Sequence, residues 1–168
     1  MAPMSAELAK AWQHYFYAAV YALPLVGAIF SDWLFGKYKT IVWISLLYCV
    51  GHGVLALVDY PSVTGVEPKW MIAGGLALLA MGAGGIKPCV SAHVGDQFGT
   101  TNAGLLPRIY NWFYLALNTG ALLSMLLTPW LLKHHGPHIA FAVPGVLMFF
   151  ATIVFWMGRH DFAHVPPD

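Results

Sequence analysis

The sequence has 168 residues, of which 59% are hydrophobic and only 9% are charged, whereas roughly a quarter of the residues are charged in an average soluble domain. This composition excludes an ordinary cytosolic protein. The net charge of +1 provides neither a basic surface for nucleic acid nor an acidic tail.

Five stretches without Asp, Glu, Lys or Arg are the first elements that the sequence predicts. Each is close to the roughly 20 residues that a helix needs to cross a hydrocarbon core about 30 Å thick. We therefore expect an all-α membrane protein with five transmembrane helices, at residues 14–33, 39–58, 69–91, 107–132 and 138–158. A polar lead at 1–13, a helical bundle at 14–158 and a cytoplasmic tail at 159–168 would make up the chain.

The short turn at residues 36–39 suggests how the helices are oriented. If this turn is cytoplasmic, four basic residues lie inside and three lie outside. Cytoplasmic loops are richer in Lys and Arg, so the balance weakly favours this orientation. The inner set is Lys37, Lys39, Arg108 and Arg159, and the outer set is Lys10, Lys69 and Lys133.

Small residues recur at every fourth position on two of the expected helices. This spacing lets membrane helices approach closely, so we expect both helices to have a side that faces protein. The two series are Ser45, Cys49 and Gly53, and Ala116, Gly120, Ser124 and Thr128.

Asn118 shares a separate face of the fourth expected helix with Asn111 and Tyr114. An amide in this position can make an interhelical hydrogen bond or line a polar cavity, and the spacing alone favours the hydrogen bond.

Three histidines, His134, His135 and His138, invite a metal or haem interpretation. Gly136 and Pro137 lie among them and no carboxylate is near in the sequence, so an exposed link between helices is the better interpretation. We expect no metal, no cofactor and no enzymatic activity.

The run at residues 27–41, GAIFSDWLFGKYKTI, resembles the loop between helices two and three of major facilitator transporters. Continued through Ser45 and Gly51, it resembles the signature of the proton-dependent oligopeptide transporter family. The segments at 84–88, 96–98 and 113–120 are similar to the family's fourth helix, the loop after it and its fifth helix, with departures at Leu117 and Thr119.

This resemblance covers residues 15–167 and maps the five expected helices onto helices two to six of the N-terminal bundle. It implies a multi-pass protein of the cytoplasmic (inner) membrane that takes part in proton-coupled symport of di- and tripeptides. The chain would be a fragment that is inactive alone, because the resemblance includes neither the family's first helix, with its Glu-x-x-Glu-Arg-Phe motif, nor a C-terminal half. Its partners would be small peptides, protons, membrane lipid and those missing parts.

Three other interpretations stay open at this point. One is a truncated membrane protein that does not transport and serves as an assembly partner. Another is a relative that carries nitrate or another small solute. The third is a membrane enzyme or redox subunit built on the histidines.

The resemblance also implies substrate-binding roles for Tyr21, Lys87 and Asn118. Lys87 would face the central cavity and couple transport to protons by pairing with an acidic residue of the first helix. The alternatives are a packing role for Tyr21 and, for Lys87, a side chain that reaches the headgroup region.

A second group of residues has an expected role in structure and gating. Glycines permit close approach and a tight turn, and charged side chains hold the loop at the membrane surface or pair with a neighbouring bundle. This group contains Gly27, Asp32, Gly36, Lys37, Lys39 and Asp96.

Overall fold

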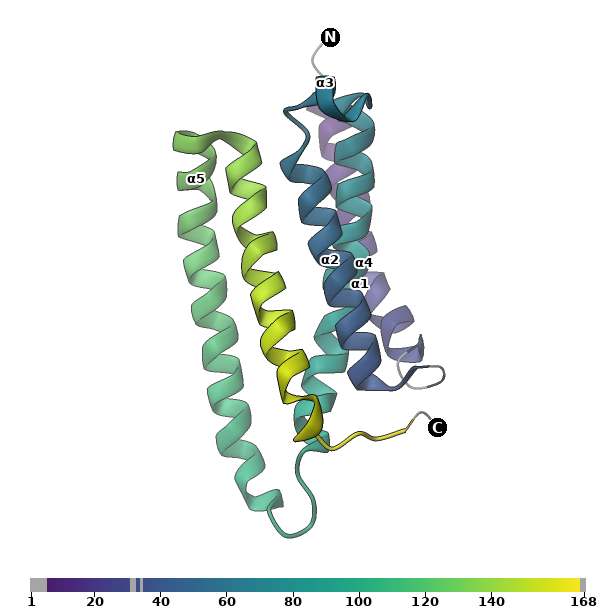
Figure 1. Ribbon diagram of the computed structural model, residues 1–168, viewed down its shortest axis with the longest axis vertical. Helices are drawn as coiled ribbons and strands as arrows, with labels where there is room; N and C mark the ends of the chain where they lie inside the picture. The colour runs from purple at the N-terminus through teal and green to yellow at the C-terminus, as the bar shows by residue number, and fades with distance from the viewer. Residues whose placement is uncertain (1–5, 31–32, 34, 167–168) are drawn as a thin grey trace.

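The computed structural model describes residues 6–30, 33 and 35–166, and these residues form helices joined by turns (Figure 1). The prediction of an all-helical fold is confirmed. In chain order the elements are α1 (Ala6–Phe30), α2 (Lys37–Ala56), α3 (Pro61–Thr64), α4 (Pro68–Asp96), η2 (Ala103–Leu105), α5 (Leu106–Met157) and η3 (Gly158–His160).

Helix α5 consists of two arms that meet at Gly136. This residue has φ +83° and ψ 175°, which glycine adopts readily because it has no Cβ. Pro137 follows, and proline is well suited to the start of a helix, where its missing N–H costs nothing. The two arms run side by side in opposite directions (Figure 1), so the bend lies within the link expected at residues 133–138.

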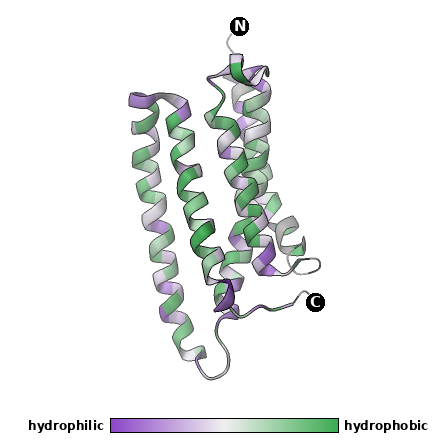
Figure 2. Cartoon of the chain, viewed as in Figure 1, coloured by the Kyte–Doolittle hydropathy of each residue, from purple (hydrophilic) through white to green (hydrophobic). Residues whose placement is uncertain are grey.

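Among the described residues, α2, α4 and the stretch Ala103–His160, which contains both arms of α5, are long and apolar enough to cross a membrane. Hydrophobic residues cover most of the length of α2 and of both arms (Figure 2). Many large apolar side chains, including Trp43, Leu126 and Val154, are exposed. A surface of this kind suits contact with lipid or with further apolar helices.

Two helices extend beyond the membrane spans expected for them. Helix α1 begins at Ala6, so part of the polar lead expected at residues 1–13 is helical, and α4 continues to Asp96 rather than ending near residue 91. A stretch without charges marks the part of a helix that suits hydrocarbon, whereas polar residues can continue the same helix into the headgroup region.

Helix α4 packs against α1 and α2 through its glycines. A Cβ atom added at Gly84 would lie 2.7 Å from the Cβ of Leu23 in α1. One added at Gly85 would lie 2.5 Å from the Cδ1 of Ile44 in α2. At Gly84 the clash is with a Cβ close to the backbone of α1, so the close approach of α1 and α4 there depends on glycine, whereas at Gly85 the terminal methyl group of Ile44 can move aside.

The two series of small residues behave differently. Ser45 is buried and the Sγ of Cys49 lies 3.9 Å from the carbonyl oxygen of Gly145, so part of the first series faces the second arm of α5. In the second series Gly120 is exposed, and a Cβ there would meet nothing within 4 Å. No described residue packs against Gly120, so the expectation that this series faces protein stays a prediction.

Candidate functional site

The three residues with expected substrate contacts lie on three different helices. Tyr21 is on α1 with 81% of its surface exposed, Lys87 is on α4, and Asn118 is on the first arm of α5. Lys87 and Asn118 are also exposed. Within the described residues no hydrogen bond or ion pair joins these three side chains to one another, and the exposed side chains of Tyr21 and Lys87 are available to a ligand or to another helix.

The amide of Asn118 turns back onto its own helix. Its Nδ2 donates a hydrogen bond of 2.7 Å to the carbonyl oxygen of Tyr114, one turn earlier. The interhelical hydrogen bond that the spacing favoured is therefore not made between the described helices.

Lys87 lies on an exposed side of α4, away from its buried glycines. Gly84, Gly85 and Cys89 are buried, whereas the Lys87 side chain is exposed and forms no ion pair with any carboxylate of the described residues. Pro88 comes next and lacks a backbone N–H, so α4 lacks one hydrogen bond of its ladder close to this lysine.

The expected structural group includes an ion pair that joins α2 to α4. The Nζ of Lys37 lies 3.1 and 2.9 Å from the two carboxylate oxygens of Asp96. Their side chains are 23% and 19% exposed, so water screens the pair only partly. The start of α2 is thereby fastened to the end of α4.

Gly36 forms the N-cap of α2 with φ +75°, in the left-handed region that favours glycine. The hydroxyl of Thr40 donates a 2.9 Å hydrogen bond to the Gly36 carbonyl oxygen. Lys39, in the first turn of α2, is exposed. Gly27 lies within α1, and Asp32 lies outside the described residues.

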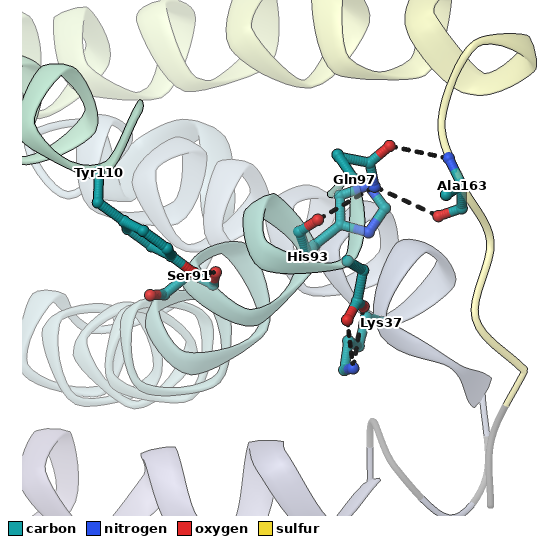
Figure 3. A network of polar contacts seen from close by, with 7 residues as sticks. Lys37, Ser91, His93, Gln97, Tyr110 and Ala163 are labelled. Atoms are coloured by element: carbon teal, nitrogen blue, oxygen red, sulfur yellow. Dashed lines mark hydrogen bonds and ion pairs between the residues drawn. The ribbon is translucent and has the colours of Figure 1, made fainter. Parts of the chain in front are cut away.

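Hydrogen bonds of Gln97 also join the C-terminal tail to α4 (Figure 3). The Ala163 backbone N–H donates to the Gln97 Oε1 at 2.8 Å. The Gln97 Nε2 donates to the carbonyl oxygens of Ala163 and His93, at 3.3 and 3.0 Å. One amide thus holds both the tail and the last turn of α4.

Aromatic rings pack together next to these hydrogen bonds of Gln97. Tyr38 stacks on Phe155 with ring centroids 5.3 Å apart, and the His164 ring meets it edge-on at 4.7 Å. The rings of His93 and Phe162 are 5.3 Å apart. This cluster is not predictable from the sequence, because its members come from three distant segments and follow no periodic pattern.

A further hydrogen bond joins the start of α5 to the last part of α4. The Tyr110 hydroxyl donates a 2.9 Å hydrogen bond to the carbonyl oxygen of Ser91, as Figure 3 also shows. A Cβ added at Gly95 would lie 2.9 Å from the same hydroxyl, so glycine provides the space for this contact.

The histidines near the α5 bend make separate contacts. The Nδ1 of His134 is 2.9 Å from the Trp130 carbonyl oxygen, and the Nδ1 of His138 is 3.7 Å from an oxygen of Asp59. In the described part of the chain no three His, Cys, Asp or Glu side chains come together as a metal site.

Comparison with known proteins shows which family this chain matches. A family model described as the POT family matches residues 38–168. The rat (Rattus norvegicus) protein "Solute carrier family 15 member 2" is 41% identical over 162 residues, which cover 92% of this chain and 22% of the relative. "Peptide transporter family 1" of Drosophila melanogaster is 40% identical over 169 residues, 96% of this chain and 23% of that protein.

Solved structures agree with these matches. The crystal structure of the POT family transporter PepTSo superposes with a TM-score of 0.88 and 43% identity, over 98% of this chain and 32% of that one. An auto-inhibited POT family peptide transporter gives the same TM-score at 41% identity. The chain thus spans less than a quarter of these two curated relatives and about a third of PepTSo.

Proposed function

Because this chain belongs to the POT family, we propose that it contributes five helical segments to a proton-coupled symporter of di- and tripeptides in the inner membrane. The observation that carries the proposal is the match along nearly the whole chain to proteins named as peptide transporters, joined to a fold with exposed polar groups on apolar helices.

Tyr21, Lys87 and Asn118 are the proposed substrate contacts. Each carries a hydrogen-bonding group and is exposed in this chain, and Lys87 and Asn118 lie on helices apolar enough to cross a membrane. An amide, a phenol and an ammonium can together meet the backbone carbonyls, N–H groups and carboxylate of a short peptide. A site of this kind would recognise the peptide backbone and tolerate varied side chains.

Lys87 is also the proposed coupling residue. A cation within an apolar helix needs an anionic partner or water, and no carboxylate of the described residues pairs with it. A carboxylate on another helix that binds and releases a proton during the cycle would make and break this ion pair.

The Lys37–Asp96 ion pair and the Gly36 turn are the proposed rigid part of the mechanism. Alternating access in related folds involves one bundle rocking against another about a central site. The ion pair fastens α2 to α4, so these helices would move as one body.

A chimera tests this function. The matching segment of PepTSo is replaced by residues 1–168 of this chain, and uptake of labelled dialanine into liposomes is measured with and without an inward proton gradient. We expect uptake that the gradient stimulates, whereas residues 1–168 reconstituted alone should give none. A chimera that is inserted and folded but takes up no dipeptide under either condition would contradict the proposal.

A further inference from the structure

A basic hollow of about 510 Å³ lies where α2 begins and the C-terminal tail leaves α5. Its basic lining residues are Lys39, Arg159, His160 and His164. Phe35 and Val165 contribute apolar walls, and none of the described lining residues carries a carboxylate. The hollow therefore concentrates positive charge from two segments that are far apart in the sequence.

The two permanent charges in this hollow are not neutralised by described neighbours. Lys39 forms no ion pair within the described chain, and the nearby Asp96 carboxylate is occupied by Lys37. The Arg159 guanidinium lies over the Trp156 ring, 3.8 Å from its centroid, and Nη1 donates to the Trp156 carbonyl oxygen at 3.2 Å. These contacts fix the guanidinium and leave its other N–H donors for a ligand.

The start of α2 adds backbone donors to the same place. Gly36, Tyr38 and Lys39 belong to the N-terminal turn and line the hollow. The first N–H groups of a helix have no partner within it, and no side chain of the described residues caps this 20-residue helix. Such an end attracts anions, and phosphate above all.

The position of the hollow relates this charge to the membrane. It lies at the ends of α2 and α5, beside the exposed rings of Phe35 and Trp156. In the orientation that the basic residues favour, this end faces the cytoplasm. Basic pockets between helices on that side attract the phosphate groups of anionic lipids.

We propose that this basic hollow binds a phosphate group, with an anionic phospholipid headgroup as the ligand at the membrane surface. The Lys39 ammonium and the Arg159 guanidinium contact the phosphate oxygens, and the N-terminal turn of α2 faces them. The lipid's acyl chains lie along the apolar exterior of α2 and α5. This site is independent of the proposed peptide transport, because it involves none of the proposed substrate contacts.

Native mass spectrometry of the 168-residue chain in non-ionic detergent tests the site. Dioleoyl phosphatidylglycerol is the probe and dioleoyl phosphatidylcholine the neutral comparison. The variant Lys39→Gln/Arg159→Gln should bind phosphatidylglycerol about tenfold more weakly. The control Lys10→Gln/Lys133→Gln removes the same charge from the opposite end of the molecule and should bind it as the unmodified chain does.

The two sources of phosphate are separated by repeating the titration with inorganic phosphate. Weaker phosphatidylglycerol binding in Lys39→Gln/Arg159→Gln, with unchanged binding in Lys10→Gln/Lys133→Gln, supports a lipid site. Binding of inorganic phosphate but not phosphatidylglycerol, with the same dependence on Lys39 and Arg159, supports a phosphate site whose ligand is soluble. Equal weakening by both double variants, or no binding of either probe, would overturn the proposal.

A second measurement avoids any dependence on how the variants fold. In the unmodified chain, acetylation of Lys39 should slow several-fold when phosphatidylglycerol, or inorganic phosphate if that is the ligand, is present, whereas acetylation of Lys133 should not change. Equal rates at Lys39 with and without both probes would overturn the proposal even if the variants were unstable.

Discussion

Lys37 and Asp96 are separated by 59 positions in the sequence, yet their ammonium and carboxylate groups are 2.9 Å apart. The ion pair joins the first residue of α2 to the last residue of α4, so it connects the two ends of the segment that contains α2, α3 and α4. It therefore sets the register in which α2 and α4 pack.

Removing this ion pair should lower the stability of the chain. We expect Asp96→Asn to reduce the free energy of unfolding by about 1 kcal/mol, because the Lys37 charge would lose its partner in a partly buried place. Unfolding in mixed detergent micelles measures the change. The matched control is Glu67→Gln, because the Glu67–Lys69 pair is 52% and 66% exposed and should contribute little. Equal effects of the two variants would contradict the structural role of Asp96.

The packing glycines of α4 give a second prediction about stability. Gly84→Ala should destabilise the chain by about 1 to 3 kcal/mol, because the new Cβ would overlap Leu23 and push α1 away from α4. Gly74→Ala is the control on the same helix, since a Cβ there meets nothing within 4 Å. It should be neutral or stabilising by up to about 1 kcal/mol, the difference in helix propensity. Equal changes in the free energy of unfolding for Gly84→Ala and Gly74→Ala would contradict the packing of α1 against α4 at Gly84.

The orientation in the membrane can be tested by cysteine labelling. With Cys49 and Cys89 replaced by serine, single cysteines at Lys39 and Ser62 should react from opposite sides. Both positions are exposed; position 39 belongs to the first turn of α2 and position 62 to α3, and the start of α2 and α3 lie at opposite ends of the molecule (Figure 1). In intact cells an impermeant maleimide should label the cysteine at 62 and spare the one at 39. Labelling of both positions would contradict the topology.

Coupling can be tested at Lys87 in the PepTSo chimera. Lys87→Ala should abolish accumulation of peptide driven by a proton gradient, while exchange of peptide between the two sides continues. Lys87→Arg should keep part of the driven activity, because the charge remains. Lys133→Ala removes a lysine at the bend of α5 and serves as the control. Normal accumulation by Lys87→Ala would mean that Lys87 only anchors α4 at the membrane surface.

The role of Asn118 can be tested by binding. Asn118→Ala in the same chimera should weaken peptide binding by about 1 to 2 kcal/mol, the usual contribution of one hydrogen bond. Isothermal titration with an unlabelled dipeptide measures this loss. Because the Asn118 Nδ2 bonds to its own helix, the thermal stability of the chimera should hardly change. Unchanged affinity with a fall in stability would assign Asn118 to packing instead.

Much of this architecture could be predicted from the sequence, for physical reasons that differ between features. Charge-free stretches identify the helices because a hydrocarbon interior excludes charge. The resemblance to the proton-dependent oligopeptide transporter family is confirmed, since the motifs at 27–41 and 113–120 are specific. The bend at Gly136 lies among Gly, Pro and His residues that interrupt the apolar pattern.

Other features could not be read from the pattern. The last turns of α4 are polar, so hydropathy places the helix end near 91, whereas the contacts of His93 and Gln97 extend the ordered structure beyond it. The contact between Gln97 and Ala163 joins residues 66 positions apart, and no periodicity predicts it. The series at 116–128 shows that spacing identifies a face without identifying what covers it.

The contact of Gln97 with Ala163 also makes α5 part of a closed loop. Residues 97–163 leave α4 and return to it, and the first arm of α5 is held within this loop by the Gly136 bend at one end and by Tyr110 at the other. Between these points most residues of the arm are exposed. The middle of the arm is therefore free to bow or rotate slightly while both of its ends stay in register, so a second bundle could press on it without disturbing the packing of α1, α2 and α4.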